Sequence, residues 1–190
     1  MRGLFTLIFS IIMLFFIHMH ATADDNSTYL SEEIQQYCFE IGEEYGVSPY
    51  LLMAIIETES RGQADAENGN CKGLMQISVK WHTGRMEHLG VTDIFDIRGN
   101  ILIGADLLTE LYETYGDMVA ALMVYHGEKN VAEKAANGEI SNYARKILER
   151  SAELEEVYEQ EETGFKYNIF DVMRINLDIR LEFVLPGGTE

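Results

Sequence analysis

Residues 118–125 are apolar at nearly every position, and this stretch constrains the fold more than any other part of the chain. Asp117 precedes it and is a favourable helix N-cap, so the stretch is expected to be helical. A helix with almost no polar face cannot lie against water, so other parts of the chain must cover it. We therefore expect a domain in which several helices surround a central one.

Further helices are predicted from the spacing of apolar residues and from capping residues. They are expected over residues 31–45, over residues 49–60 behind an N-cap at Ser48, after Ser78, from a cap at Asn100, over residues 131–136, and from Ser141 to about residue 161. Residues 62–72 are rich in Gly, Asn and Asp and are expected to form a loop. The predicted fold class is mostly α.

The start of the chain resembles an export signal. Arg2 precedes an apolar run over residues 4–17, and Ala21-Thr22-Ala23 supplies the small residues that a signal peptidase reads. The run is shorter than the roughly 20 apolar residues that span a bilayer. A cleaved signal over residues 1–23 is therefore favoured over a retained membrane anchor, and the mature protein is expected to be extracytoplasmic.

The end of the chain follows a different pattern. From Met173 to Leu185 apolar and polar residues alternate, which is the periodicity of a β-strand. Such a segment is expected to form a hairpin, to pack on the helical domain, or to add to the sheet of another chain. The predicted organisation is a signal at 1–23, a helical domain at 24–160 and a β-type tail at 161–190.

Composition excludes some functions. The chain has 32 acidic and 14 basic residues and a formal charge of −18, which disfavours binding to nucleic acid. Two cysteines without a nearby histidine pair give no zinc pattern, and no phosphate-binding glycine motif is present, so no cofactor is expected. Cys38 and Cys71 are a candidate disulfide in an exported protein, worth about 3–4 kcal/mol if formed.

Glu59 is the candidate catalytic residue. On the helix expected over residues 49–60 it shares one stripe with the apolar Leu51 and Ile55, whereas Glu57 points the opposite way and is expected to be solvated. A carboxyl on a core-facing stripe loses hydration, which penalises its charged form and favours a role as general acid. The alternative is that Glu59, near the helix end, turns to solvent or pairs with Arg61.

A set of motifs surrounds this glutamate in sequence order. They are Glu59-Ser60, the polar loop, Gly73-Leu74-Met75-Gln76, Asn100 with Gly104, Tyr125, and Tyr143. In order and spacing this set resembles the SLT-type domain of the lysozyme-like lytic transglycosylases, over about residues 31–150. The resemblance implies a lysozyme-like helical domain with a cleft.

The resemblance also implies a reaction. Glu59 would act as acid and then as base on the β-1,4 bond between N-acetylmuramic acid and N-acetylglucosamine in peptidoglycan. The C6 hydroxyl of the muramic acid would attack, giving a 1,6-anhydro sugar, so one carboxyl would suffice. The expected substrate-binding residues are Ser60, Gly73, Leu74, Met75, Gln76, Tyr125, His126 and Tyr143.

One departure from the family pattern and two rival functions remain. The family usually has Ala-Tyr-Asn-Ala-Gly where this chain has Val-Tyr-His-Gly-Glu, which puts the substrate contact at His126 in doubt. A goose-type lysozyme would hydrolyse the same bond and would need a second carboxylate, such as Asp65, Asp93 or Asp96. A catalytically silent glycan-binding module, or a scaffold, is the third reading. Conjugation-type secretion systems and phage use enzymes of this kind, and the tail is a candidate docking segment for them.

Overall fold

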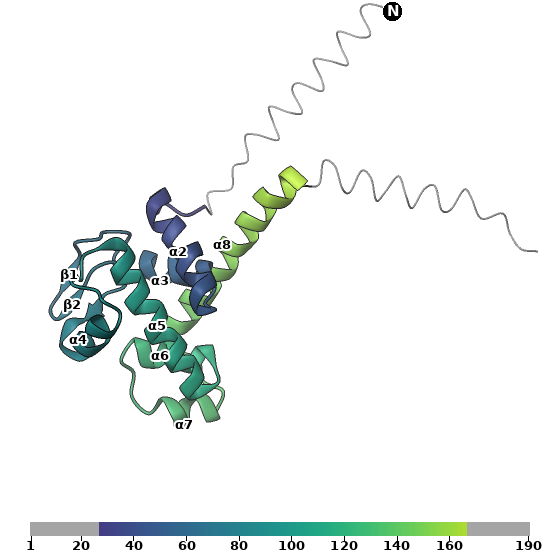
Figure 1. Ribbon diagram of the computed structural model, residues 1–190. Coiled ribbons are helices and arrows are strands. Elements are labelled where there is room, and N and C mark those ends of the chain that lie inside the picture. Colours follow the sequence, from purple (N-terminus) through teal and green to yellow (C-terminus); the bar gives the residue numbers. More distant parts are fainter. Residues whose placement is uncertain (1–26, 167–190) are drawn as a thin grey trace, which may run out of the picture.

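Seven helices and three short strands follow one another in residues 27–166, the part of the chain that the computed structural model describes (Figure 1). The helices are α2 (Glu32–Tyr45), α3 (Pro49–Glu59), α4 (Val79–His88), α5 (Ile97–Tyr115), α6 (Met118–Tyr125), α7 (Val131–Ala136) and α8 (Asn142–Lys166). The strands β1 (Glu67–Asn68), β2 (Cys71–Lys72) and β3 (Ile77–Ser78) form an antiparallel sheet in that order. The predicted mostly helical class is confirmed, and the architecture is consistent with a lysozyme-like fold.

Local capping chemistry accounts for several helix boundaries. The Ser31 hydroxyl accepts the backbone N–H of Ile34 at the start of α2, and Gly46 ends that helix with a φ of 66°. The Asp117 carboxylate accepts two backbone N–H groups at the start of α6. These predicted boundaries are confirmed.

Two other predicted caps make no side-chain bond, and a third is misplaced. Ser48 and Ser78 precede α3 and α4, but neither side chain accepts a capping hydrogen bond. Helix α5 begins at Ile97 and not at Asn100, because the Asp96 carboxylate accepts the N–H of Gly99 at 2.7 Å. Asn100 therefore lies inside α5, and its side chain is available for another contact.

The centre of the domain is built from α3 and its neighbours. Every residue from Leu51 to Glu57 is buried, because α3 packs against both α2 and α8. Residues 120–123 of α6 are also buried, and α6 contacts α5, α7 and α8, as the apolar pattern predicts. In Figure 1 the long helix α8 extends from the α6 end of the domain past α2. Helix α8 can therefore contribute side chains at the α6 end of the domain and also near α2.

The candidate disulfide between Cys38 and Cys71 is not formed, and both thiols are free. Cys38 faces the core from α2 and has no exposed surface, whereas Cys71 lies half-buried on β2. Burial raises the pKa of the Cys38 thiol well above its usual range. The two cysteines belong to different parts of the domain, and the predicted bridge is wrong.

The predicted signal at 1–23 lies outside the described residues, as does the alternating segment at 173–185. Helix α8 continues to Lys166, so the first residues of the predicted tail are helical. Within residues 27–166, none of the helices combines the length and hydrophobicity that a bilayer crossing requires.

Candidate functional site

Glu59 is the last residue of α3, and the chain turns sharply behind it. Arg61 and Gly62 have φ angles of 57° and 76°, in the left-handed region, which leads the chain away from the helix axis. The Glu59 side chain is half-buried and lies at the helix end, with one side open to solvent. The expectation of a carboxyl held against an apolar wall is therefore only partly met.

Tyr143 on α8 is the hydrogen-bond partner of Glu59. Its hydroxyl donates to Oε1 of Glu59 at 2.6 Å, although the two residues are 84 positions apart in sequence. Burial, and then the neighbouring Tyr125 and Glu59, raise the pKa of the Tyr143 phenol, so it stays a proton-bearing donor. The structure does not show the alternative in which Glu59 pairs with Arg61, because the Glu59 carboxyl accepts a hydrogen bond from Tyr143 instead.

Glu57 is the more buried of the two glutamates, whereas the sequence predicted that it would face solvent. Its side chain is 7% exposed and forms an ion pair with Arg150 of α8, with Oε2 at 2.7 Å from Nε. The hydroxyl of Thr28 donates to Oε1 at 2.6 Å, and that of Tyr29 donates to the Glu57 carbonyl at 3.2 Å. We call Thr28, Tyr29, Glu57 and Arg150 the Glu57 cluster. The prediction that Glu57 faces solvent failed because α8 covers that face of α3.

The Gly-Leu-Met-Gln turn is fastened to α5 by Asn100. The buried Asn100 amide accepts the N–H of Met75 at 2.8 Å and donates to the carbonyls of Lys72 and Ile94. A Cβ at Gly73 would clash with the Asn100 side chain, so glycine is required there. Asn100 fills the space beside the Gly73 α-carbon, so the glycine permits this packing, and its expected approach to a sugar stays a prediction.

Leu74 and Met75 are completely buried, so neither side chain reaches the surface. A Cβ at Gly104 would clash with the Met75 sulfur, which shows how closely the turn packs on α5. The expected sugar contacts of Leu74 and Met75 are therefore replaced by roles in the core. The Met75 carbonyl accepts the hydroxyl of Tyr125 at 2.6 Å. Burial first, and then electrostatic interactions with Glu59 and Cys71, raise the pKa of Tyr125 well above its usual value.

Gln76 and Ser60 lie near Glu59, and each side chain hydrogen-bonds to the backbone. Gln76 has a φ of 49°, and its amide nitrogen donates to the carbonyls of Ala66 and Gly73. The Ser60 hydroxyl donates to the carbonyl of Ile56 at 3.2 Å and not to Glu59. Both side chains therefore stabilise the local backbone, and both also line the pocket described next.

A pocket of about 410 Å³ opens beside Glu59. Its lining is largely polar and comes from the end of α3, the following loop and the hairpin: Thr58, Glu59, Ser60, Arg61, Gln63, Ala66, Glu67, Asn68 and Gln76. Glu67 is a second carboxylate in this pocket and pairs with Lys72 at 2.6 Å. Polar groups at this density suit hydroxyl and amide groups of a sugar.

The three aspartates considered as second carboxylates lie elsewhere. Asp93 accepts the N–H of Phe95 at 2.9 Å, and Asp96 caps α5. Asp65 is exposed, and none of the three aspartates lines the pocket. Sequence reasoning missed Glu67 because a glutamate in a polar loop carries no local signal. Its place in the same pocket as Glu59 depends on the pairing of β1 with β2.

His126 completes the surroundings of Glu59. Its imidazole stacks on the Tyr143 ring, with ring centroids 4.0 Å apart and planes at 11°. We call Glu59, Tyr125, His126 and Tyr143 the Glu59 cluster. Tyr125 and His126 stand at the end of α6, Tyr143 at the start of α8 and Glu59 at the end of α3. Three helix ends therefore contribute to the Glu59 cluster, and of these residues Glu59 alone also lines the pocket.

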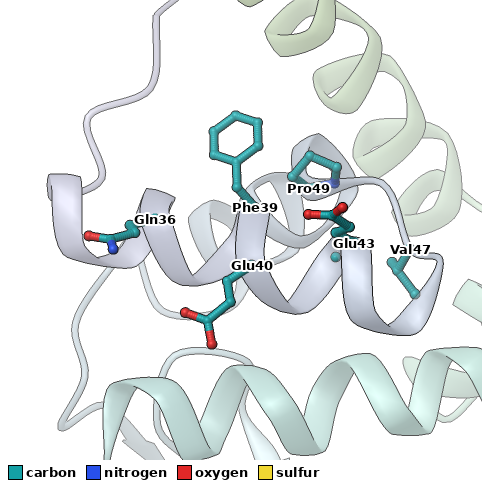
Figure 2. Close-up of a pocket in the computed structure, with 7 residues that line it drawn as sticks. Gln36, Phe39, Glu40, Glu43, Val47 and Pro49 are labelled. Atoms are coloured by element: carbon teal, nitrogen blue, oxygen red, sulfur yellow. The ribbon is translucent and has the colours of Figure 1, made fainter.

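A larger hollow, of about 610 Å³, lies along α2, and no residue of the Glu59 cluster lines it (Figure 2). Its lining includes Phe39, Glu40 and Glu43, and in Figure 2 the Phe39 and Glu40 side chains leave α2 in opposite directions. Glu40 pairs with Arg98 at 3.0 Å. Within residues 27–166 no group of three or more His, Cys, Asp or Glu is arranged to hold a metal ion.

Comparison with known proteins assigns the chain to a family. The Transglycosylase SLT domain family matches residues 36–146, more than half of the chain. The Transglycosylase of Enterobacteria phage PRD1 is 35% identical over 106 residues, which is 55% of this chain and 38% of the phage protein. The aligned part thus spans well under half of that relative's length. The chain belongs to the Transglycosylase SLT domain family.

Proposed function

We propose that this protein is a peptidoglycan lytic transglycosylase in which Glu59 is the general acid and base. The observation that carries the proposal is the Tyr143 hydrogen bond to Glu59, 2.6 Å long, at the edge of a polar pocket of about 410 Å³. A carboxyl in such a place is oriented by one oxygen and presents the other to a bound ligand. The family membership points to a glycan ligand.

The proposed reaction needs no water and no second protein carboxylate. Glu59 protonates the glycosidic oxygen between N-acetylmuramic acid and N-acetylglucosamine, and the bond from that oxygen to C1 of the muramic acid breaks. The C6 hydroxyl of the same sugar then forms a bond to C1 and returns its proton to Glu59. The products are an N-acetylglucosamine end with a free hydroxyl and a 1,6-anhydro end, and Glu59 is regenerated as the acid.

The test is digestion of purified peptidoglycan by the wild type and by Glu59→Gln, with mass spectrometry of the released fragments. We expect anhydro ends from the wild type and a loss of about 10²- to 10⁴-fold in rate for the variant. Glutamine keeps an oxygen that accepts from Tyr143, so the thermal unfolding temperature should be preserved. Wild-type protein that binds glycan and releases no fragment would favour a silent binding module.

Hydrolysis of the same bond is the second candidate, and Glu67 is the observation that favours it. Glu67 lines the same pocket as Glu59 and is the additional carboxylate that activation of a water would need. Fragments with reducing ends from the wild type, lost in Glu67→Gln, would establish hydrolysis. Under the transglycosylase proposal, Glu67→Gln still produces anhydro ends.

We also propose that the protein acts outside the cytoplasm, where peptidoglycan lies. The support is the signal-like segment at 1–23, which lies outside the described residues. Mass spectrometry of protein recovered from the extracytoplasmic fraction should give a chain that begins at Asp24, whereas intact residues 1–23 would contradict cleavage. Association with a secretion or phage assembly through residues 161–190 is a further proposal, tested by deleting residues 167–190 and measuring recruitment.

A further inference from the structure

His126 lies over Tyr143 at the outer edge of the Glu59 cluster. It is the C-cap residue of α6, and its backbone N–H donates to the carbonyl of Leu122 at 3.0 Å, which fixes where the side chain starts. Its imidazole is exposed and nearly parallel to the half-buried phenol ring of Tyr143, with a centroid distance of 4.0 Å. The hydroxyl at the far end of that ring is the one that holds Glu59.

We propose that His126 is a positioning residue for the Tyr143–Glu59 hydrogen bond, and that protonation of its imidazole slows the proton-donating step. The proposal rests on the assignment of Glu59 as the general acid. It extends that assignment to a residue that does not contact the carboxyl and that acts through the Tyr143 ring.

The first part of the proposal concerns geometry. A tyrosine ring on a surface helix can leave its site by rotating about its side-chain bonds, and a parallel aromatic neighbour opposes that rotation. Here the stack joins the end of α6 to the start of α8. Loss of the stack should therefore loosen the Tyr143 hydroxyl from Glu59 and lower kcat, while the fold stays intact.

The second part concerns charge. An imidazolium over the face of a phenol ring is favoured by the ring's electrons, and it makes the phenol a stronger donor. A stronger donor, and a positive charge nearby, both favour the ionised form of Glu59 over the protonated form. The first step consumes a proton carried by Glu59. Protonation of His126 therefore opposes that step, and the rate should fall as the pH drops through the range in which histidine titrates.

Other titratable and charged groups lie around His126. Glu128 lies two residues further on, and its carboxylate accepts from Lys134 of α7 at 2.7 Å. The Lys134 hydrogen bond, chiefly, lowers the pKa of Glu128, with a smaller contribution from His126. Glu128 is thus an anion close enough to the imidazole for the two groups to interact electrostatically. Tyr125 and Tyr143 are neutral here because burial raises the pKa of each phenol.

The first experiment compares pH profiles of kcat for the wild type, His126→Phe and His126→Asn, each normalised to its own maximum. Phenylalanine keeps a ring for the stack and cannot ionise, whereas asparagine provides neither. We expect the wild-type rate to fall about three- to tenfold more than that of His126→Phe between pH 7.5 and 5.5. His126→Asn should have the same pH profile as His126→Phe but a lower kcat.

A matched control varies the neighbour. Glu128→Gln removes an anion that favours the imidazolium, so the fall in rate should move to lower pH while its size is retained. A profile that is unchanged in Glu128→Gln and also in His126→Phe would assign the ionisation to another group and overturn the regulatory part. Equal kcat values for His126→Phe and His126→Asn would overturn the positioning part.

The second experiment does not depend on activity. Coupling is reciprocal, so if the imidazolium favours ionised Glu59, ionised Glu59 must favour the imidazolium. NMR titration of the His126 ring, assigned with His126→Phe, should show a midpoint lowered by about 0.3–0.5 pH unit in Glu59→Gln. An unmoved midpoint would overturn the coupling. Coupling without any glycan cleavage by the wild type would instead overturn the proposed function alone.

Discussion

Two carboxyls at the end of α3, separated by a single residue, lie in opposite surroundings. Glu57 is 7% exposed and is neutralised by Arg150, with a further hydrogen bond from Thr28. Glu59 is half-buried, has no cationic partner among the described residues, and accepts from a neutral phenol at a pocket. An ion-paired carboxylate holds no proton to give, whereas a carboxyl beside a neutral donor can exchange one.

Helix α8 produces this difference, because it reaches both residues. Tyr143 in its first turn contacts Glu59, and Arg150, two turns later, contacts Glu57. The Glu57 cluster thus fastens α8 to α3, and the Glu59 cluster uses the resulting alignment. One cluster is expected to determine stability and the other to determine rate.

Exchanging the two glutamates for glutamine, one at a time, should give the largest effects. Glu59→Gln should lose about 10²- to 10⁴-fold in kcat with little change in stability. Glu57→Gln removes the buried charge that pairs with Arg150, leaves Arg150 the exposed Glu153 as an anionic partner, and should lower the free energy of unfolding by about 3 kcal/mol. Urea unfolding and fragment release measure the two quantities. A stable and inactive Glu57→Gln would contradict the division of roles.

Replacing the ion pair as a whole sharpens the same comparison. Arg150→Met alone should cost about 3 kcal/mol because the Glu57 carboxylate stays buried. Glu57→Leu combined with Arg150→Met removes both charges and should unfold within about 1 kcal/mol of the wild type. Fragment release by the double variant should be measurable at 25 °C. Additive losses in the double variant would show that the helices depend on the charges themselves.

Removing one hydroxyl tests the Glu59 cluster. Tyr143→Phe keeps the ring and its stack on His126 but removes the donor to Glu59, and kcat should fall about 10- to 100-fold. The matched control is Tyr125→Phe, which leaves the buried Met75 carbonyl without its donor and should cost about 1–3 kcal/mol of stability. If Tyr125→Phe lowered kcat more than Tyr143→Phe did, the assigned partner of Glu59 would be wrong.

Sequence reasoning reached the parts of the fold that depend on local pattern. The start of α2 at Ser31 and of α6 at Asp117, and the whole of α7, follow from capping and periodicity over a few residues. The proposed roles of Glu59, Tyr125 and Tyr143 came from the order of motifs along the chain. The structure adds the hydrogen bond from Tyr143 to Glu59.

The remaining features depend on pairs far apart in sequence. Glu57 was expected in solvent because nothing near it indicates Arg150, which is 93 residues away. Asn100 was interpreted as a cap because a helix start and a buried anchor both favour asparagine, and only the position of the Met75 turn distinguishes them. The hairpin that brings Glu67 to the pocket has strands of two residues, too short for a periodic signal.

The two thiols extend the comparison of a buried and an accessible side chain to chemical labelling. Cys38 is sealed in the core, and burial raises the pKa of its thiol, so both access and thiolate formation are suppressed. Cys71 is half-buried on β2, close enough to Tyr125 to affect that phenol. Iodoacetamide at pH 8 should therefore alkylate Cys71 at least about 10²-fold faster than Cys38, as peptide mapping would show.

Denaturation supplies the control for that experiment. In urea without reductant both thiols should react at similar rates, because each is then solvated and neither is bridged. The raised pKa of Cys38 also determines how its reactivity depends on pH. Its thiolate forms only well above the usual range, so raising the pH to 9 leaves native Cys38 unreactive. If the denatured, unreduced chain took up no reagent, the two cysteines would be bridged after all. The contrast between a buried and an accessible thiol would then be wrong.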